Sequence, residues 1–170
     1  MDNTYDLLEE KIKETFIKVS DDLVNRRITG DGPWTSAIKT ALTELAYNEP
    51  YNYWVWANKN NCDDTINEWL YDMTWSESYD NKGQDFKTIH LILESEWNRN
   101  FLEIKYDFYK LLQGRAKHRV FLFQSSDVER IMNDLEEIIE KSIIAEKSDR
   151  YLLAGWNDNY GFTFRLHIKK

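Results

Sequence analysis

The residues best suited to chemistry are two acids, Glu94 and Glu96, at the end of the apolar run from His90 to Trp97. Side chains alternate across a strand, so the two acids share one face with Ile92. The other face carries Leu91, Leu93, Ser95 and Trp97. A strand that is apolar on both faces is typical of the covered centre of a sheet. The two carboxylates, about 7 Å apart along the backbone, would then be buried anions that need a partner such as a metal ion. If the sheet frays here instead, both acids are solvated.

Two further acids interrupt apolar patterns elsewhere in the chain. Asp72 lies in the run from Glu68 to Trp75, which alternates like a strand. Glu44 lies in a predicted helix, seven residues after Ala37, and this spacing brings it close to the direction of the apolar stripe. An acid at the margin of a buried stripe either forms a salt bridge or helps to build an active site.

The elements that would position these acids follow one another without an internal repeat or a low-complexity tract. Helical periodicity predicts helices over residues 5–24, 34–48, 101–115 and 125–145. Alternating or wholly apolar runs predict strands over residues 51–57, 68–75, 90–97, 120–123, 151–156 and 162–168, the last two as a hairpin. This order places the chain in the α/β class, with a central mixed β-sheet flanked by helices.

Length and composition indicate one globular domain, because 170 residues that are 42% hydrophobic can bury a sizeable core. We divide it into an N-terminal helical extension (1–30), a core (33–124) and a helix plus hairpin (125–170). The first helix could pack on the domain or form a dimer, and the sequence does not choose. A single cysteine, Cys62, excludes an internal disulfide framework. No secretion signal or bilayer-length apolar run is visible, so we expect a cytoplasmic protein without a membrane partner.

The formal net charge of −8 argues against a protein that coats nucleic acid through bulk electrostatics. Any contact with nucleic acid must then come from local basic patches. The histidines show no zinc-ligand spacing, and no glycine-rich phosphate loop is present. Candidate phosphate contacts are Lys39, Lys59, Arg99, Arg115, Lys117 and Arg119.

Glu44 on a helix, Asp72 on a strand and Glu94-Ser95-Glu96 on a later strand, followed by a helix and a strand, resemble a known pattern. It is the αβββαβ core of the PD-(D/E)XK nuclease superfamily, the restriction-endonuclease-like fold. The resemblance covers roughly residues 33–124, and it rests on short motifs in the right order. It implies that Asp72 and Glu94 hold a divalent metal, usually Mg²⁺, and that Glu44 corresponds to the helix acid of many members.

The pattern departs from the family at Glu96, which stands where a lysine usually orients or activates the attacking water. A glutamate adds negative charge and cannot do the same work. Lys105 or Lys110, on the next predicted helix, could supply an ammonium from another element, and we prefer Lys110. We therefore predict that Asp72, Glu94 and Glu96 converge on one Mg²⁺ ion, with Mn²⁺ as a substitute and Glu44 in or beside the coordination sphere.

The resemblance implies hydrolysis of phosphodiester bonds in nucleic acid, and we favour DNA. Magnesium suits this reaction because it neutralises developing charge and lowers the pKa of a bound water. Sequence-specific cutting by so small a chain would call for a homodimer. The alternative is a catalytically degraded nuclease-fold protein that acts as a binding or interaction module. The missing lysine and the net acidity favour it, and the retained Asp72, Glu94 and Glu44 oppose it.

Overall fold

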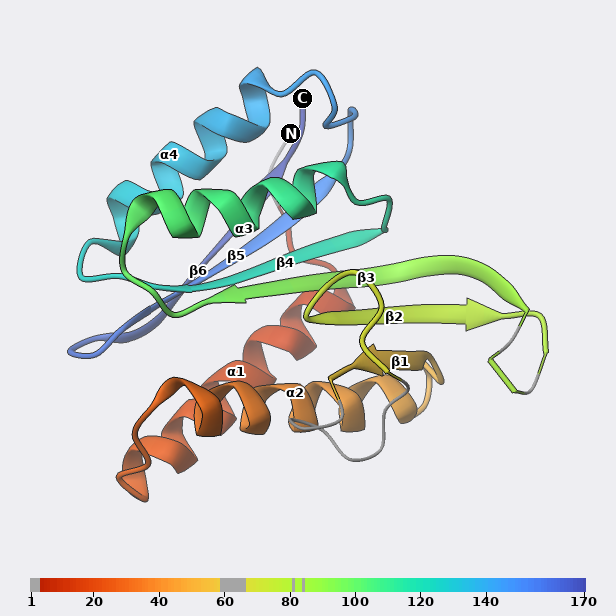
Figure 1. Ribbon diagram of the computed structural model, residues 1–170, viewed down its shortest axis with the longest axis horizontal. Helices are drawn as coiled ribbons and strands as arrows, with labels where there is room; N and C mark the ends of the chain where they lie inside the picture. The colour runs from red at the N-terminus through yellow and green to blue at the C-terminus, as the bar shows by residue number, and fades with distance from the viewer. Residues whose placement is uncertain (1–3, 59–66, 81, 84) are drawn as a thin grey trace.

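A computed structural model describes residues 4–58, 67–80, 82–83 and 85–170 (Figure 1). Lys59 and Cys62 lie outside these residues. The helices are α1 (Leu7–Asn25), α2 (Asp31–Tyr47), α3 (Phe101–Gln113) and α4 (Val128–Lys141). The strands are β1 (Trp54–Ala57), β2 (Met73–Ser78), β3 (Phe86–Glu96), β4 (His118–Gln124), β5 (Arg150–Asn157) and β6 (Gly161–Ile168). Among the described residues, no helix combines the length and apolar character that a bilayer crossing requires.

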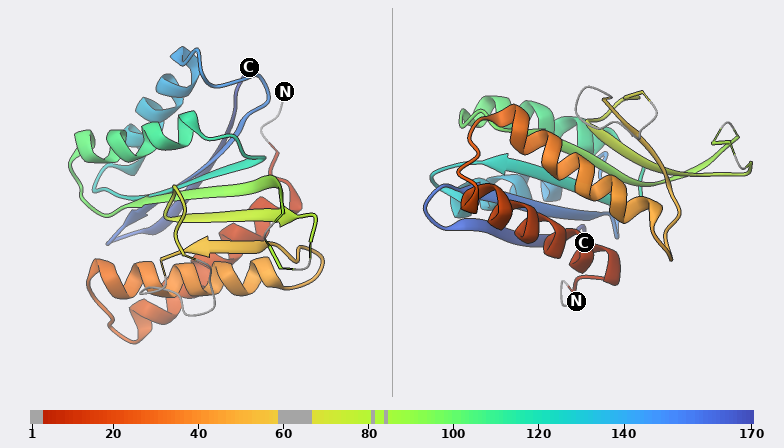
Figure 2. Two further views of the ribbon diagram at one scale, coloured as in Figure 1. Left: turned by 45° about the vertical axis from the view of Figure 1, so that its right-hand side comes forward. Right: turned by 90° about the horizontal axis from the view of Figure 1, so that it is seen from below.

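One six-stranded mixed sheet forms the centre of the molecule, with its strands in the order β1-β2-β3-β4-β5-β6. The three strands β3, β4 and β5 run parallel, and the remaining pairs are antiparallel. Helices α3 and α4 connect the parallel strands and cover one face, while α1 and α2 cover the other (Figures 1 and 2). The predicted class, a central mixed sheet flanked by helices, is confirmed.

The sheet continues past β4, where we had placed the boundary of the core. β5 pairs with β4 from His118 opposite Arg150 to Gln124 opposite Trp156, and β6 pairs with β5 along its whole length. The crossover through α4 brings β5 beside β4, so the C-terminal hairpin is part of the same sheet.

The strand predicted over residues 68–75 is displaced toward the C-terminus. The ladder between β1 and β2 begins at Met73, which pairs with Ala57, so the preceding residues have no partner on β1. Polar residues that we had assigned to a loop continue the ladder instead, because its backbone hydrogen bonds do not depend on side-chain polarity. Asp72, predicted on the strand, therefore lies immediately before it.

The alternation predicted for the central strand is confirmed. Leu91 and Leu93 belong to the core between the sheet and helices α1 and α2. Ile92 belongs to the separate core between the sheet and helices α3 and α4. Both cores are built largely from fully buried side chains, which fixes the register of β3. The face that holds Ile92 must therefore also hold Glu94.

Helix α1 packs on the sheet of its own chain, which is the first of the two arrangements left open by the sequence. Phe16 is fully buried and stacks against Phe162 and Phe164 of β6, with ring centroids 5.5 and 6.2 Å apart. At the other end of the helix, Glu9 is 1% exposed and accepts hydrogen bonds from Arg150 Nε (2.7 Å) and Nη2 (2.5 Å). This ion pair ties α1 to β5.

The ion pair also sets the ionisation of Glu9. Burial opposes the charged form, but hydrogen bonds from Arg150, His118 and the backbone N–H of Asp6 outweigh it and lower the pKa of Glu9 to about 2. A depressed carboxyl pKa stabilises the fold above the unfolded-state value, and that stability is lost as the pH falls toward 2.

We expect Glu9→Gln to lower the free energy of unfolding at pH 7 by about 3 kcal/mol, because it leaves the Arg150 guanidinium without its anion in a largely buried setting. Urea unfolding of both proteins measures the difference, which should shrink between pH 4.5 and pH 2. Glu14→Gln is the control, since its partner Lys11 is solvent-exposed and the pair contributes little. A loss from Glu9→Gln no larger than that of the control would contradict the anchoring role.

Candidate functional site

The structure brings the predicted acids Asp72, Glu94 and Glu96 to the same region, where β2 begins and β3 ends. Glu94 lies on β3 with 2% of its surface exposed, and its Oε2 accepts a hydrogen bond from Lys110 Nζ of α3 at 3.1 Å. Asp72 lies beside it, because its neighbour Met73 pairs with Leu93. Glu96 follows two residues later on the same face of β3.

Glu94 has an environment that disfavours its charge. Burial is the largest cause, the negative charge of Asp72 adds to it, and together they raise the pKa of Glu94 to about 7 although Lys110 acts in the opposite direction. A carboxyl group with this pKa exchanges its proton near neutral pH, so a small change in its surroundings can switch its charge.

Asp72 is held by groups from the other side of the sheet. Its Oδ2 accepts hydrogen bonds from the backbone N–H of Ser95 (2.8 Å) and from Ser95 Oγ (2.7 Å). Its Oδ1 lies 3.5 Å from Nζ of Lys39, a buried lysine of α2. Asp72 therefore stands just before the start of β2, between the two faces, whereas Glu94 points toward α3.

A fourth acid, Asp107 of α3, completes the network. Its Oδ1 lies 2.7 Å from Lys110 Nζ, so one ammonium bridges Asp107 and Glu94. Burial and a hydrogen bond with Asp107 raise the pKa of Glu96, whose Oε1 also accepts the backbone N–H of Asn98 (2.6 Å). We refer to Asp72, Glu94, Glu96 and Asp107 together as the acid cluster.

Glu44 does not join the cluster. It is exposed on α2, so the expectation that it lies at the margin of the buried stripe is wrong. Lys39 is the residue of this helix that reaches Asp72, and five residues on a helix turn the direction by about 140°. A side chain at position 44 therefore points away from the acids.

Sequence reasoning missed the roles of Lys39 and Asp107. A signal for Lys39 was present, because it lies between Ile38 and Leu42 of the apolar stripe and therefore close to the sheet. For Asp107 the signal was its spacing of three residues from Lys110, which places the two on one face of a helix. Neither signal says which partner lies across the sheet.

A different group satisfies the simplest distance test for a metal site. Among the described residues, Asp6, Glu9 and His118 offer ligand atoms that all lie within 4.8 Å of one another, whereas Asp72, Glu94 and Glu96 do not. These three could hold an ion, but both carboxylate oxygens of Glu9 already bind Arg150. A metal would have to displace the guanidinium that anchors α1, so we assign this group a structural role.

The acid cluster, in contrast, has a surplus of negative charge. Its four carboxylates are accompanied by two ammonium groups, those of Lys39 and Lys110. With all groups ionised, two negative charges remain uncompensated, and the raised pKa of Glu94 is one consequence. Oxygen ligands with this surplus suit a hard divalent cation. Binding one would draw the carboxylates of Asp72 and Glu94 closer than they now lie.

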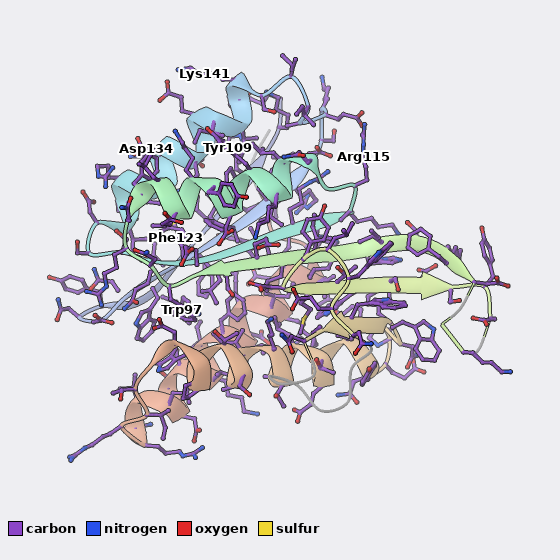
Figure 3. The ribbon with its side chains drawn as sticks, in the orientation of Figure 1. Trp97, Tyr109, Arg115, Phe123, Asp134 and Lys141 are labelled. Carbon is purple, nitrogen blue, oxygen red and sulfur yellow. The ribbon has the colours of Figure 1, made fainter. Side chains whose placement is uncertain are left out.

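Two of the basic residues considered for phosphate contacts are not available for them. Lys39 and Arg119 are buried in ion pairs with Asp72 and Asp149. Among the described candidates, Arg99, Arg115 and Lys117 remain exposed, and Arg115 lies in the connection between α3 and β4 (Figure 3). Arg99 is the one that follows directly on the strand of the acid cluster.

Comparisons with known proteins find no relative of the chain: no protein-family model, no curated protein and no solved structure matches it. What the protein does has to be inferred from its own residues.

The ionisation of Glu94 predicts a pH effect on stability. Its pKa is raised in the folded protein, so the fold carries no cost from this group below pH 4.5 and loses stability as the pH rises toward 7. Glu94→Gln removes the titration. Between pH 4.5 and 8 we expect the wild type to lose on the order of 3 kcal/mol relative to the variant.

Urea unfolding at the two pH values measures this difference. Glu103→Gln, an exposed glutamate of the first turn of α3, is the control and should follow the wild type. Parallel stability curves for the wild type and Glu94→Gln would mean that Glu94 titrates normally.

Proposed function

We propose that this protein is a divalent-metal-dependent nuclease that hydrolyses phosphodiester bonds in nucleic acid, with DNA as the favoured substrate. The observation that supports it most directly is the environment of Glu94, a buried carboxyl group. It lies beside three further acids, Asp72, Glu96 and Asp107, and the four carboxylates outnumber the two ammonium groups near them. Such a surplus is costly for the fold unless it serves to bind a cation.

In this proposal, Glu94 and Asp72 hold the metal, with Glu96 within reach. Mg²⁺, or Mn²⁺ in its place, would neutralise charge on the phosphoryl oxygens and lower the pKa of a bound water. Glu94 must lose its proton before it can bind a cation, so its pKa of about 7 makes metal affinity rise with pH.

Lys110 supplies the ammonium that Glu96 cannot. Hydrogen bonds to Asp107 and Glu94 raise its pKa despite partial burial, so it remains protonated at neutral pH. A positive charge fixed between two acids can orient a water molecule or a phosphoryl oxygen beside Glu94. Asp107 positions this ammonium through the contact at 2.7 Å.

One observation favours the alternative of a degraded nuclease-fold module. Asp72 already binds Ser95 and Lys39, and Glu94 already binds Lys110, so part of the charge is balanced within the protein. A binding module would retain these contacts for stability and would show no metal-dependent activity.

Nicking of supercoiled plasmid in the presence of Mg²⁺ distinguishes the nuclease from the binding module. We expect Asp72→Asn and Glu94→Gln to lower the rate by about 100-fold or more, because each removes a ligand of a metal that contributes several kcal/mol to transition-state stabilisation. Chelation with EDTA should abolish nicking. Glu14→Gln, a change at an exposed glutamate of α1, prepared identically, should match the wild type. Equal nicking by all four preparations would identify a contaminant, and the nuclease proposal would fail.

Lys110→Met tests the substitute lysine. Methionine keeps an unbranched side chain of similar length but removes the ammonium. We expect nicking to fall by about 10²-fold to 10³-fold, the loss that follows removal of one fixed donor that stabilises developing charge. Calorimetric titration should show Mg²⁺ affinity that is unchanged or higher, since a competing positive charge is gone. Wild-type nicking by this variant would remove Lys110 from the mechanism.

A further inference from the structure

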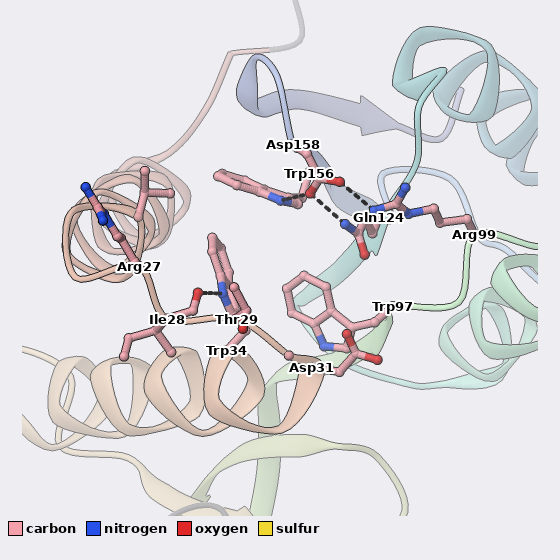
Figure 4. A pocket seen from close by; sticks show the side chains of 12 residues that line it. Arg27, Ile28, Thr29, Asp31, Trp34, Trp97, Arg99, Gln124, Trp156 and Asp158 are labelled. Atoms are coloured by element: carbon pink, nitrogen blue, oxygen red, sulfur yellow. Dashed lines mark hydrogen bonds and ion pairs between the residues drawn. The ribbon is translucent and has the colours of Figure 1, made fainter.

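A cavity of about 420 Å³ opens on the opposite face of the sheet from Glu94, at the carboxyl ends of the three parallel strands. Three tryptophans line it (Figure 4): Trp34 from the first turn of α2, Trp97 directly after β3, and Trp156 near the end of β5. Its volume is that of a small-ligand site, and open α/β sheets bind ligands at this edge.

Hydrogen bonds fix all three indole rings. Trp34 donates to the carbonyl of Ile28 (3.1 Å), Trp97 to Oγ1 of Thr35 (2.8 Å) and Trp156 to Oδ1 of Asp158 (3.1 Å). The indole N–H groups are therefore satisfied by the protein, and the ring carbons are left to line the cavity. The centroid of Trp34 lies 4.6 Å from that of Trp156 and 5.9 Å from that of Trp97. The plane of Trp34 is inclined by 70° to that of Trp97 and by 51° to that of Trp156, so the rings line the cavity from different directions and a flat heteroaromatic ring can lie against one of them.

Two arginines lie at the rim of the cavity, one in an ion pair and one without an ion pair among the described residues. Arg99 Nη2 binds Asp158 Oδ2 at 2.5 Å, and Gln124 Nε2 binds Asp158 Oδ1 at 2.8 Å. Arg27 lines the other side of the cavity and is exposed, with its guanidinium turned away from the three tryptophans (Figure 4). In the described part of the chain this guanidinium forms no ion pair, so its long side chain can turn toward a ligand. An unpaired arginine beside an aromatic cavity is suited to a phosphate.

The backbone at Arg27 gives independent support. Helix α1 ends with Ile28 N–H bonded to the carbonyl of Leu23 (2.9 Å) and Arg27 N–H bonded to the carbonyl of Val24 (3.0 Å), and Arg27 has φ of 56°. This left-handed cap position usually holds glycine, because a Cβ atom is disfavoured there. The chain places an arginine where glycine would be more stable, at the mouth of the cavity.

We propose that the cavity binds one unpaired nucleotide of a nucleic-acid strand, its base against the tryptophans and its phosphate on Arg27. The proposal rests on the proposed function for the choice of nucleic acid. Trp97 follows directly after β3 and is three residues from Glu94, so about 10 Å of backbone separates Glu94 from the cavity. A nucleic-acid strand whose phosphodiester bond lies at Glu94 can reach the cavity around the end of β3.

This assignment names the substrate class. A base paired within a duplex has both faces covered by its neighbours and cannot lie against an indole ring. An unpaired base can, and base–aromatic stacking tolerates any sequence. The substrate is therefore single-stranded or locally unpaired nucleic acid.

Arg27→Gly gives the sharpest test, because it should improve the fold while weakening the site. We expect its melting temperature to rise by about 2–4 °C, since the left-handed strain is removed. Binding of a labelled single-stranded oligodeoxynucleotide, followed by anisotropy on the Glu94→Gln background without metal, should weaken by about 5-fold to 10-fold. Arg26→Gln is the matched control: it removes an adjacent charge that pairs with Asp22 outside the cavity, and its binding should stay within about 2-fold.

Three results would overturn the proposal, and the first two are unchanged affinity in Arg27→Gly and a duplex of the same sequence that binds as tightly as the single strand. Either result, with metal-dependent nicking intact, would leave the proposed function standing. Thymidine monophosphate that binds as tightly as the oligonucleotide would also overturn it, because the ligand would then be a free nucleotide. If the protein shows no metal-dependent nicking but Arg27→Gly still weakens oligonucleotide binding, the cavity would bind nucleic acid and the nuclease proposal would fail.

Discussion

The structure depends on one costly arrangement, an ionisable carboxyl group buried between a central strand and the helix that covers it. β3 is apolar on both faces, so it must lie in the middle of the sheet, and its register turns Glu94 toward α3 with 2% of its surface exposed. The crossover helix α3 then has to supply a counter-charge, and Lys110 does so. Ser95 holds Asp72 beside the same strand, and the ammonium groups of Lys110 and Lys39 are fewer than the acids around them, so the charge surplus follows from the fold itself.

Two buried glutamates in this protein differ in how far their surroundings balance their charge. Glu9 is bonded by a guanidinium through both oxygens, and its pKa falls to about 2, whereas Glu94 faces one ammonium and a second acid, and its pKa rises to about 7. Short distances between ligand atoms single out the group that contains Glu9. Availability for a new cation is a separate property, because it depends on whether the charge is already balanced. By that criterion Glu94 is the better candidate.

Sequence patterns predicted the features that are set within one segment of the chain, such as which residues share a face of a strand. Alternation along β3 placed Ile92 and Glu94 on one face and Leu91 on the other, because the period of a strand is fixed by its backbone. Helical periodicity failed for Glu44, since the edge of an apolar stripe spans a wide angle and only the neighbouring sheet decides which side is covered. The contact of Lys39 with Asp72 crosses from a helix to a strand, and no pattern within either segment contains it.

Net charge constrains how such a protein can meet a polyanion. With a formal charge of −8 the chain repels nucleic acid at long range, and the acid cluster repels a phosphate at short range until a cation neutralises it. In the proposed function, attraction must then come from contacts that charge does not weaken, and the contacts we propose are those of the aromatic cavity. The carboxyl edge of the parallel strands places that cavity and the acids on opposite faces of one strand end. A nucleic-acid strand held by stacking on Trp97 would bring its phosphates toward Glu94 without a broad basic surface, so the net acidity of the chain is compatible with the proposed function.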